Sequence, residues 1–389
     1  MAKKRIIALA ALAHLWASAA PAATFSVLHA FSGGSADGIT PQSPLIRDSS
    51  GNLYGTTLFG GFYGLGTIYK LDPAGKLTVL HSFNGQSDGG LSYGGVIRDS
   101  AGNLYGANFL AAGTGCGGEG CGTVYKLAAS GTFKVLHTFT GGSDGGQPYG
   151  SLVHDASGNL YGTTLYGGNI SANSTCGVVF KLDPSGALTV LHSFSFSDGA
   201  NPWASLVRDS VGNMYGTASS GGTGNSGVIF KLDTALNFSV IFNFAGGDGG
   251  SSHMGPLSVD SAGNLYGTTE SGGTGDFGTA FVLDSALDLT VLHNFVGGST
   301  GFQPYTSDLA RDSAGNLYGT TMNGGNSECF CGVVFEKEAA GTYSLLHRFS
   351  GGDDGSLPLN GVLYSGGNLF GTASHGGANG AGVIFRIKP

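Results

Sequence analysis

The chain has 389 residues, of which 73 are glycine and only 11% are charged. Hydrophobic residues reach 41% and aromatic residues 11%, so the composition predicts many short strands joined by tight turns and excludes coiled coils. The net charge is −8, and removal of Lys3, Lys4 and Arg5 leaves 14 bases against 25 acids, or −11. Such a surface repels phosphates, so nucleic-acid binding is not expected.

Residues 1–23 are predicted to be a secretory signal peptide. A basic start is followed by an apolar stretch over residues 6–17, which is too short to span a bilayer comfortably, and then by small residues that offer A-x-A cleavage sites. The alternative is a buried N-terminal helix. No other apolar run approaches membrane length, so we expect an exported protein, periplasmic or extracellular, without membrane insertion.

The rest of the chain repeats one motif seven times. Gly-Asn-Leu-Tyr-Gly or a close variant starts at residues 51, 102, 158, 212, 263, 315 and 367. The spacing varies by only a few residues, which predicts one structural unit per copy. Residues 24–389 are therefore expected to form a single domain.

Each copy is predicted to hold four short strands. In the first copy these cover residues 44–48, 53–57, 66–71 and 77–83. Their β-branched and aromatic content, and the Gly, Asp and Asn residues between them, fit the pattern of strands and hairpins. In the Asp-x-x-Gly turns the Asp side chain bonds the backbone two residues on, and Gly takes the positive φ.

The two ends of the chain carry the strongest prediction of fold. A fourth-strand motif at residues 25–31 precedes any first strand, and the last copy stops after its third strand, at residues 382–387. The N-terminal strand is therefore expected to complete the last unit. Closure removes exposed edges, which predicts an all-β, seven-bladed β-propeller. A β-solenoid or two packed sheets are the alternatives.

The unit Val-Leu-His-Ser-Phe…Asp-Gly…Asp-Ser-x-Gly-Asn-Leu-Tyr-Gly-Thr-Thr…Gly-Gly…Gly-Thr-Val-Tyr-Lys-Leu resembles the GloVer-type tandem repeats of exported bacterial proteins. The likeness covers residues 24–389. It implies a surface or extracellular protein, often held by a C-terminal anchor. The sequence printed to Pro389 shows no sorting anchor, so a departure from that pattern is expected. The family supplies no catalytic residues to carry over.

The fourth-to-first connections repeat Asp-Gly-x-x-Pro-aromatic and are expected on the same face as the variable loops between strands two and three. The Asp residues are Asp37, Asp88, Asp144, Asp198, Asp248 and Asp354, with Thr300 in the remaining copy. Five residues later come Gln42, Tyr93, Tyr149, Trp203, His253, Tyr305 and Leu359.

These positions suit sugar recognition, because rings stack on pyranose faces and carboxylates accept hydroxyl hydrogen bonds. The predicted ligand-binding residues are Tyr93, Tyr149, Trp203, His253, Tyr305, Asp88, Asp144 and Asp198. In the alternative, the aromatic residues fill gaps between blades and each Asp bonds its own loop.

Most histidines recur at one place in the predicted outer strand, where Phe242 is the seventh counterpart, and this replacement indicates a packing role. They are His29, His81, His137, His192, His293 and His347. The Tyr of each Gly-Asn-Leu-Tyr-Gly motif is interpreted in the same way. His253 and His375 fall outside the series, near the loop face.

Five cysteines remain. Cys116 and Cys121 are a possible disulfide, whereas Cys329 and Cys331 are too tightly spaced for an easy one. The odd count, with Cys176, leaves at least one thiol free or intermolecular. No metal site or cofactor is predicted, and calcium at the Asp-Gly loops has weak support because each loop offers one carboxylate.

No catalytic motif is present, so the preferred function is an exported, non-catalytic binding propeller whose loop face contacts a glycan or an envelope or surface protein. A hydrolase or lyase at the channel mouth is the first alternative, and it rests on analogy between folds. A structural or assembly component of the cell envelope is the second. The ligand and the oligomeric state stay open.

Overall fold

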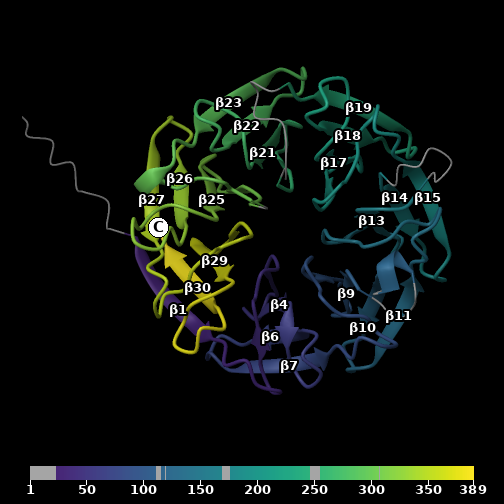
Figure 1. The fold of residues 1–389 in the computed structure, drawn as a ribbon, viewed down its shortest axis with the longest axis horizontal. Helices are drawn as coiled ribbons and strands as arrows, with labels where there is room; N and C mark the ends of the chain where they lie inside the picture. Colours follow the sequence, from purple (N-terminus) through teal and green to yellow (C-terminus); the bar gives the residue numbers. More distant parts are fainter. Residues whose placement is uncertain (1–22, 111–114, 119, 169–175, 246–254, 306) are drawn as a thin grey trace, which may run out of the picture.

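The computed structural model describes residues 23–110, 115–118, 120–168, 176–245, 255–305 and 307–389. Seven four-stranded antiparallel sheets stand around a central axis and form a β-propeller (Figure 1). The prediction of a seven-bladed propeller is confirmed. Residues 1–22 of the expected signal peptide lie outside the described residues.

The strands occupy corresponding positions in the seven blades. The first strands are β3 (Ile46–Arg47), β8 (Ile97–Arg98), β12 (Val153–His154), β16 (Val207–Arg208), β20 (Ser258–Val259), β24 (Ala310–Arg311) and β28 (Leu363–Ser365). The second strands are β4 (Leu53–Thr57), β9 (Leu104–Asn108), β13 (Leu160–Thr164), β17 (Met214–Ala218), β21 (Leu265–Thr269), β25 (Leu317–Thr321) and β29 (Asn368–Ala373).

The outer half of each blade is equally regular. The third strands are β6 (Thr67–Leu71), β10 (Thr123–Leu127), β14 (Val178–Leu182), β18 (Val228–Leu232), β22 (Thr279–Leu283), β26 (Val333–Lys337) and β30 (Val383–Lys388). The fourth strands are β7 (Leu77–Ser82), β11 (Phe133–Thr138), β15 (Leu188–Ser193), β19 (Phe238–Asn243), β23 (Leu289–Asn294), β27 (Tyr343–Arg348) and β1 (Thr24–Ala30). A short pair, β2 (Gly38–Ile39) with β5 (Phe59–Gly60), and the 3₁₀ turns η1 (Cys116–Gly118) and η3 (Gly298–Thr300) lie in the connections.

The ring is closed by its two ends. The last sheet has the order β1-β30-β29-β28, and β1 runs antiparallel to β30 with Phe25 opposite Ile387. Figure 1 shows the purple N-terminal strand beside the yellow C-terminal one. The predicted closure is confirmed, and it leaves no blade without its outer strand.

The first strands lie nearest the axis, since β16 contacts β20 and β24 contacts β28 across blade boundaries. In the first blade this strand covers two residues, which is shorter than the five predicted. The side chain of Ser43 takes the place of a backbone partner there. Its hydroxyl accepts from the N–H of Thr56 and donates to the carbonyl of the same residue, at 2.8 and 3.2 Å.

The core lies between neighbouring blades and is built from one aromatic pair per interface. The Phe that follows each fourth strand packs on the third-strand ring of the next blade, with centroids 5.2–5.6 Å apart. The pairs are Phe31–Tyr69, Phe83–Tyr125, Phe139–Phe180, Phe194–Phe230, Phe244–Phe281, Phe295–Phe335 and Phe349–Phe385.

The repeated glycine of the second strand makes room for this ring. At Gly162 an added Cβ would come within 2.8 Å of the Phe180 ring, which is closer than a side chain tolerates. The same holds at Gly216, where the neighbour is Phe230. The Gly-Asn-Leu-Tyr-Gly motif therefore repeats because the interface ring of each blade needs this space.

Cysteines at Ser26 and Arg386 are expected to form a disulfide that locks the ring, because these residues lie opposite each other in β1 and β30. Non-reducing peptide mapping detects the link, and chemical unfolding should show a gain of up to about 5 kcal/mol. The control pairs Ser26→Cys with Lys388→Cys, two residues out of register. Equal cross-linking of the control pair would argue against the closure register.

Candidate functional site

The propeller has two unlike faces. The Asp-x-x-Gly turns, which join strands one to two and three to four, form one face, which we call the turn face. The fourth-to-first connections and the loops between strands two and three form the other, the loop face. The second-to-third loops vary in length and sequence, and variable loops on a rigid scaffold commonly carry function.

Each fourth-to-first connection that the structure describes around this position is fixed by a non-glycine residue in the left-handed region. At Gln147 φ is 57°, its N–H donates to the carbonyl of Cys121 in blade 2, and its carbonyl accepts from the N–H of Leu165 in blade 3. Equivalent residues with φ of 53–59° are Thr40, Leu91, Asn201, Gln303 and Leu357. Two backbone bonds to adjacent blades hold this strained conformation in place.

This left-handed residue positions the aromatic residue two places further along the chain, near the central axis. Tyr93 and Tyr149 stack with centroids 4.4 Å apart and planes 19° from parallel. Trp203 meets Tyr149 edge to face at 4.9 Å. Tyr305 hydrogen bonds Tyr149, and burial is the main cause that raises the pKa of both phenols. Four of the predicted ligand-binding residues are thus brought together.

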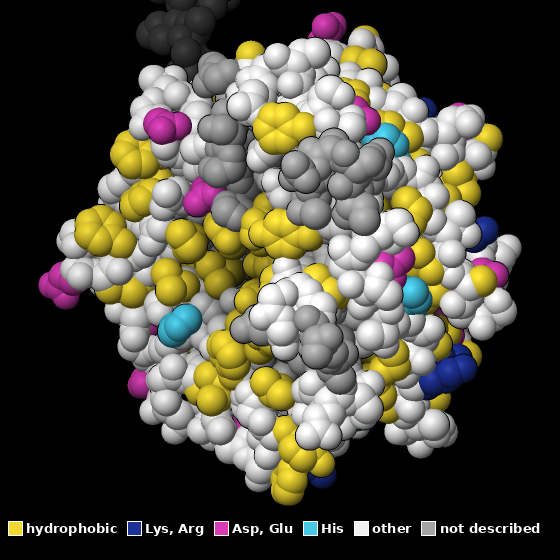
Figure 2. Space-filling view, turned by 45° about the vertical axis from the view of Figure 1, so that its right-hand side comes forward, with side chains coloured by type: hydrophobic (Ala, Val, Ile, Leu, Met, Phe, Trp, Pro, Cys, Tyr) yellow, Lys and Arg dark blue, Asp and Glu magenta, His cyan; other side chains and the backbone are white. Residues whose placement is uncertain are grey.

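These rings close most of the channel mouth. Tyr93, Tyr149 and Trp203 surround a cavity of about 20 Å³, which has room for about one water molecule. The rings remain half-buried, so part of each faces solvent. Figure 2 shows hydrophobic side chains lining the hollow at the centre of the loop face. A ligand at this position would lie on the rings and not between them.

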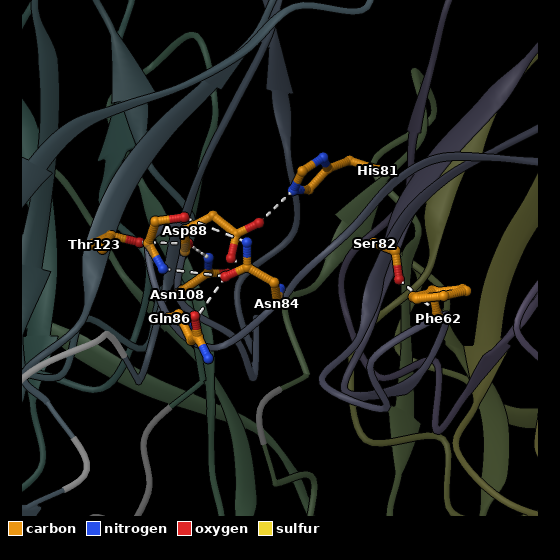
Figure 3. Close-up of polar contacts among 9 residues, drawn as sticks. Phe62, His81, Ser82, Asn84, Gln86, Asp88, Asn108 and Thr123 are labelled. Atoms are coloured by element: carbon orange, nitrogen blue, oxygen red, sulfur yellow. Dashed lines mark hydrogen bonds and ion pairs between the residues drawn. The ribbon is translucent and has the colours of Figure 1, made fainter.

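The predicted carboxylates lie elsewhere. Asp88 is 5% exposed, and its carboxylate accepts from the N–H of Asn84 and contacts His81 Nε2, both at 2.8 Å (Figure 3). Its carbonyl accepts from Asn108 and Thr123 of the next blade. Asp88 therefore joins the outer strand of one blade to its neighbour and does not share a rim with the tyrosines.

The same contact recurs around the ring. The described pairs, at 2.8–3.3 Å, are His29–Asp37, His81–Asp88, His137–Asp144, His192–Asp198 and His347–Asp354. The sequence did not predict that the His and Asp series meet. Their recurring separation of six to eight residues was the signal that could have joined them.

Several of these imidazoles also stack on the next blade. His81 lies 3.9 Å from the ring of Phe133, and His192 lies 3.5 Å from that of Phe238, with planes almost parallel. His293 stacks on Tyr343, and His347 stacks on Phe25 of the closing strand. The histidine series thus packs at blade boundaries.

Two predicted residues, His253 and Asp248, lie outside the described residues. His375 is exposed on the loop face, and its Nδ1 lies 2.9 Å from Ser374 Oγ. Glu270 lies near Tyr305, whose pKa it helps burial to raise. Groups of three or more His, Cys, Asp or Glu able to hold a metal do not occur among the described residues.

The structure joins Cys116 to Cys121 and also Cys329 to Cys331, while Cys176 is free and buried. The sequence predicted no easy disulfide between Cys329 and Cys331 but left a strained one open, and the structure pairs them. Phe330 between them takes a φ of 50°, which brings the two Cα atoms to 5.1 Å, within the normal range for a disulfide.

The loop face is rich in aromatic residues and poor in bases. The exposed aromatic residues of the described chain are Phe59, Phe62, Tyr63, Tyr166, Phe196, Phe277 and Phe330, and each lies in a loop of this face. Beyond residue 23, every Lys and Arg lies in a strand, apart from Lys76 in a turn of the opposite face.

The model of the Gloeobacter/Verrucomicrobia repeat matches residues 16–210 and 169–385, which together span almost the whole chain. The chain belongs to the Gloeobacter/Verrucomicrobia repeat family. This agrees with the predicted resemblance. No curated protein matches this Gloeobacter/Verrucomicrobia repeat chain in sequence.

Among solved structures, the extracellular domain of the putative one component system BT4673 from B. thetaiotaomicron is similar over 92% of this chain, with 13% identity and a TM-score of 0.57. A second structure, described as that of the putative hybrid two component system BT4673, covers 94% of this chain with 15% identity and a TM-score of 0.55. This Gloeobacter/Verrucomicrobia repeat protein spans only 39% and 42% of those two chains.

A gluconolactonase from Xanthomonas campestris, XC5397, matches over 68% of this chain and 78% of its own, with 13% identity and a TM-score of 0.42. At these identities the BT4673 domains show the propeller fold, and the gluconolactonase supports no conclusion. In the described residues of this repeat protein, no helix has the length and apolar character needed to cross a membrane.

His81→Phe is expected to lose the contact with Asp88 but to keep the stack on Phe133, because Phe242 already occupies the equivalent position. The free energy of unfolding should fall by about 1–3 kcal/mol. His81→Ala should lose about 0.5–1.5 kcal/mol more, because the stack is also lost. Urea unfolding measures both, with His375→Ala as the exposed control. Equal losses of stability in His81→Phe and His81→Ala would show that the stack on Phe133 does not stabilise the protein.

Acidification is expected to destabilise the protein through His293. Burial, assisted by the charge of Lys337, lowers the pKa of this imidazole to about 4, from an ordinary 6.5. As the pH drops, the unfolded state therefore takes up a proton on His293 before the folded state does. The contribution of His293 to stability is complete above pH 6.5 and is lost as the pH drops towards 4. Urea midpoints between pH 7 and 4 should fall less steeply in His293→Phe.

Burial also lowers the pKa of His192 and His347, partly opposed by their aspartates, so both add to the same acid loss. The control is His375→Phe, at an exposed position. If the His293→Phe and wild-type midpoints stay parallel over this range, His293 does not contribute.

Proposed function

We propose that this chain is an exported, non-catalytic binding propeller whose loop face binds a neutral polysaccharide. The observation that carries the proposal is the one-sided distribution of aromatic residues. Every exposed aromatic side chain of the described residues lies on the loop face, around the cluster of Tyr93, Tyr149 and Trp203. Exposed apolar area of this kind on a soluble domain marks a binding surface.

The chemistry of this face favours a sugar polymer. Tyr and Trp rings offer flat apolar area with a polar edge, and they lose little conformational freedom when they bind. The rings at the axis are already packed against one another, so their orientation is set before a ligand arrives. Such a surface fits the apolar faces of pyranose rings.

The charge of the loop face favours neutral over acidic polysaccharides. Its loops contain no Lys or Arg but carry acidic residues such as Glu270, Asp276 and Glu328. Uronic or sulfated polysaccharides would be repelled, which leaves neutral chains. Asp88, Asp144 and Asp198 already contact histidines, so the proposal rests on the rings and not on these carboxylates.

The small volume between the rings sets the mode of binding. A cavity of about 20 Å³ does not admit a sugar, so the polymer would lie across the aromatic cluster. Contact with several rings at once predicts binding to chains and weak binding to monosaccharides. An envelope or surface protein is the rival occupant, and neither family membership nor the similarity to extracellular domains decides between them.

Residues 24–389 are expected to bind insoluble neutral polysaccharides saturably, and Trp203→Ala to bind at least about tenfold more weakly, as for a central aromatic anchor. Pull-down isotherms with and without calcium measure this. Val211→Ala, on the turn face and 71% exposed, is the control and should bind normally.

Thermal unfolding of each variant checks that it is folded. If folded wild-type protein binds no neutral polysaccharide, the proposal is wrong, and a protein partner becomes the preferred hypothesis for the loop face. If Trp203→Ala binds as well as the wild type, the sugar site lies elsewhere. If binding requires calcium, the hypothesis of a calcium ion at the Asp-Gly loops is supported.

A further inference from the structure

A second hollow lies next to the cavity of the aromatic cluster, and Pro44 lines both. It has a volume of about 350 Å³, which is at the lower end of the range for small-molecule sites. Its walls are the inner strands β20, β24 and β28 with the start of blade 1. The lining mixes polar and apolar groups, and its partly exposed apolar side chains include Val259 and Leu363.

The hollow exists because two blades depart from the repeat. The first residue of the inner strand is Ile or Val in blades 1 to 4, at Ile46, Ile97, Val153 and Val207. Blades 5 and 6 carry Ser258 and Ala310 instead, and both line the hollow. The missing methyl groups of these two residues leave space on one side of the axis.

A carboxyl group stands at the same place. Asp308 lines the hollow at a position that is Pro, Gly or Ser in the other blades. Its Oδ1 lies against Gly361, where any side chain would collide with it. Burial raises the pKa of Asp308 to about 6, despite a hydrogen bond from its own backbone N–H.

The nearby base is engaged elsewhere. Arg311 and Tyr364 are the other charged or titratable residues that line the hollow. The guanidinium of Arg311 lies 4.0 Å from Asp260 and over the ring of Tyr266, and the ring of Tyr364 stacks on Tyr318. Among the described residues, no Lys or Arg forms an ion pair with Asp308.

A hydroxyl in the same wall also lacks a partner. Ser258 Oγ is buried and makes no hydrogen bond within the described part of the chain. A buried hydroxyl without a partner is unfavourable, and the partly buried carboxylate of Asp308 has no cationic partner among the described residues, so a ligand with N–H donors would satisfy both groups.

We propose that this axial hollow binds a small organic cation, a primary amine with a short apolar chain, whose ammonium group pairs with Asp308 and hydrogen bonds Ser258. The apolar chain would lie against Val259 and Leu363. One carboxylate is too few ligands for a metal ion, whereas it is sufficient for an ammonium group. The net charge of −8 attracts cations in general.

Isothermal titration of residues 24–389 with n-butylamine and benzylamine at pH 8, with 1-butanol as the neutral probe, tests the proposal. The amines should bind saturably and the alcohol should not. Asp308→Ser introduces the residue of blades 3 and 4, and it should weaken amine binding at least about tenfold. Ser258→Val, again a residue that other blades carry, should do so by filling the hollow.

Asp353→Ser is the matched control, because this acid is exposed on the loop face. It should bind amines like the wild type. Absence of amine binding to the wild type overturns the proposal. So does unchanged binding by Asp308→Ser, which would place the cation elsewhere. These results do not bear on polysaccharide binding, so the two proposals fail separately.

Without ligand, Asp308 is expected to reduce stability as the pH rises. Its folded-state pKa of about 6 lies above the ordinary 3.8, so the folded state holds the proton more tightly. Wild-type stability relative to Asp308→Ser should therefore fall as the pH rises from 4 to 8. Amine binding should weaken below pH 6 as the carboxylate is protonated. A constant difference in urea midpoint would show that Asp308 is not buried as described.

Discussion

The aromatic pair at each blade boundary is the contact on which the rest of the propeller depends. At all seven boundaries a buried Phe from one blade meets the third-strand ring of the next, as Phe194 meets Phe230. A glycine in the second strand, such as Gly216, leaves the space for that ring. Because each blade contributes one member to two pairs, no blade can bury its core without both neighbours, and the ring must close.

Polar contacts on the loop face then fix the connections over this core. The left-handed residue at Gln147 and its equivalents bonds two blades through its backbone, while the His81–Asp88 pair and its counterparts tie each loop to the outer strand. Tyr93, Tyr149 and Trp203 are therefore carried by connections with little freedom to move. Rigid presentation of aromatic rings is what a binding surface needs.

On such a repetitive scaffold, we expect functional sites where one blade departs from the repeat. Where every blade repeats a residue, as with the interface Phe, the residue serves the ring. Where one blade departs, the structure gains a feature that symmetry would forbid, as with the hollow created by Ser258 and Ala310 beside Asp308. The same reasoning applies to Trp203, which is the one Trp among the seven equivalent positions of the repeat. The two proposed sites both arise where the repeat is broken.

The sequence by itself determined the repeat, the four strands of each unit and the closure by residues 25–31, because strand periodicity, Gly and Asp turns and the offset of the two ends can be read from the order of residues. Only the tertiary structure decided which equivalent residues meet. It separated Asp88 from Tyr93, paired Cys329 with Cys331 and placed Asp308 in a hollow. The physical reason is that these relations depend on distances between blades, which a pattern within one repeat does not contain.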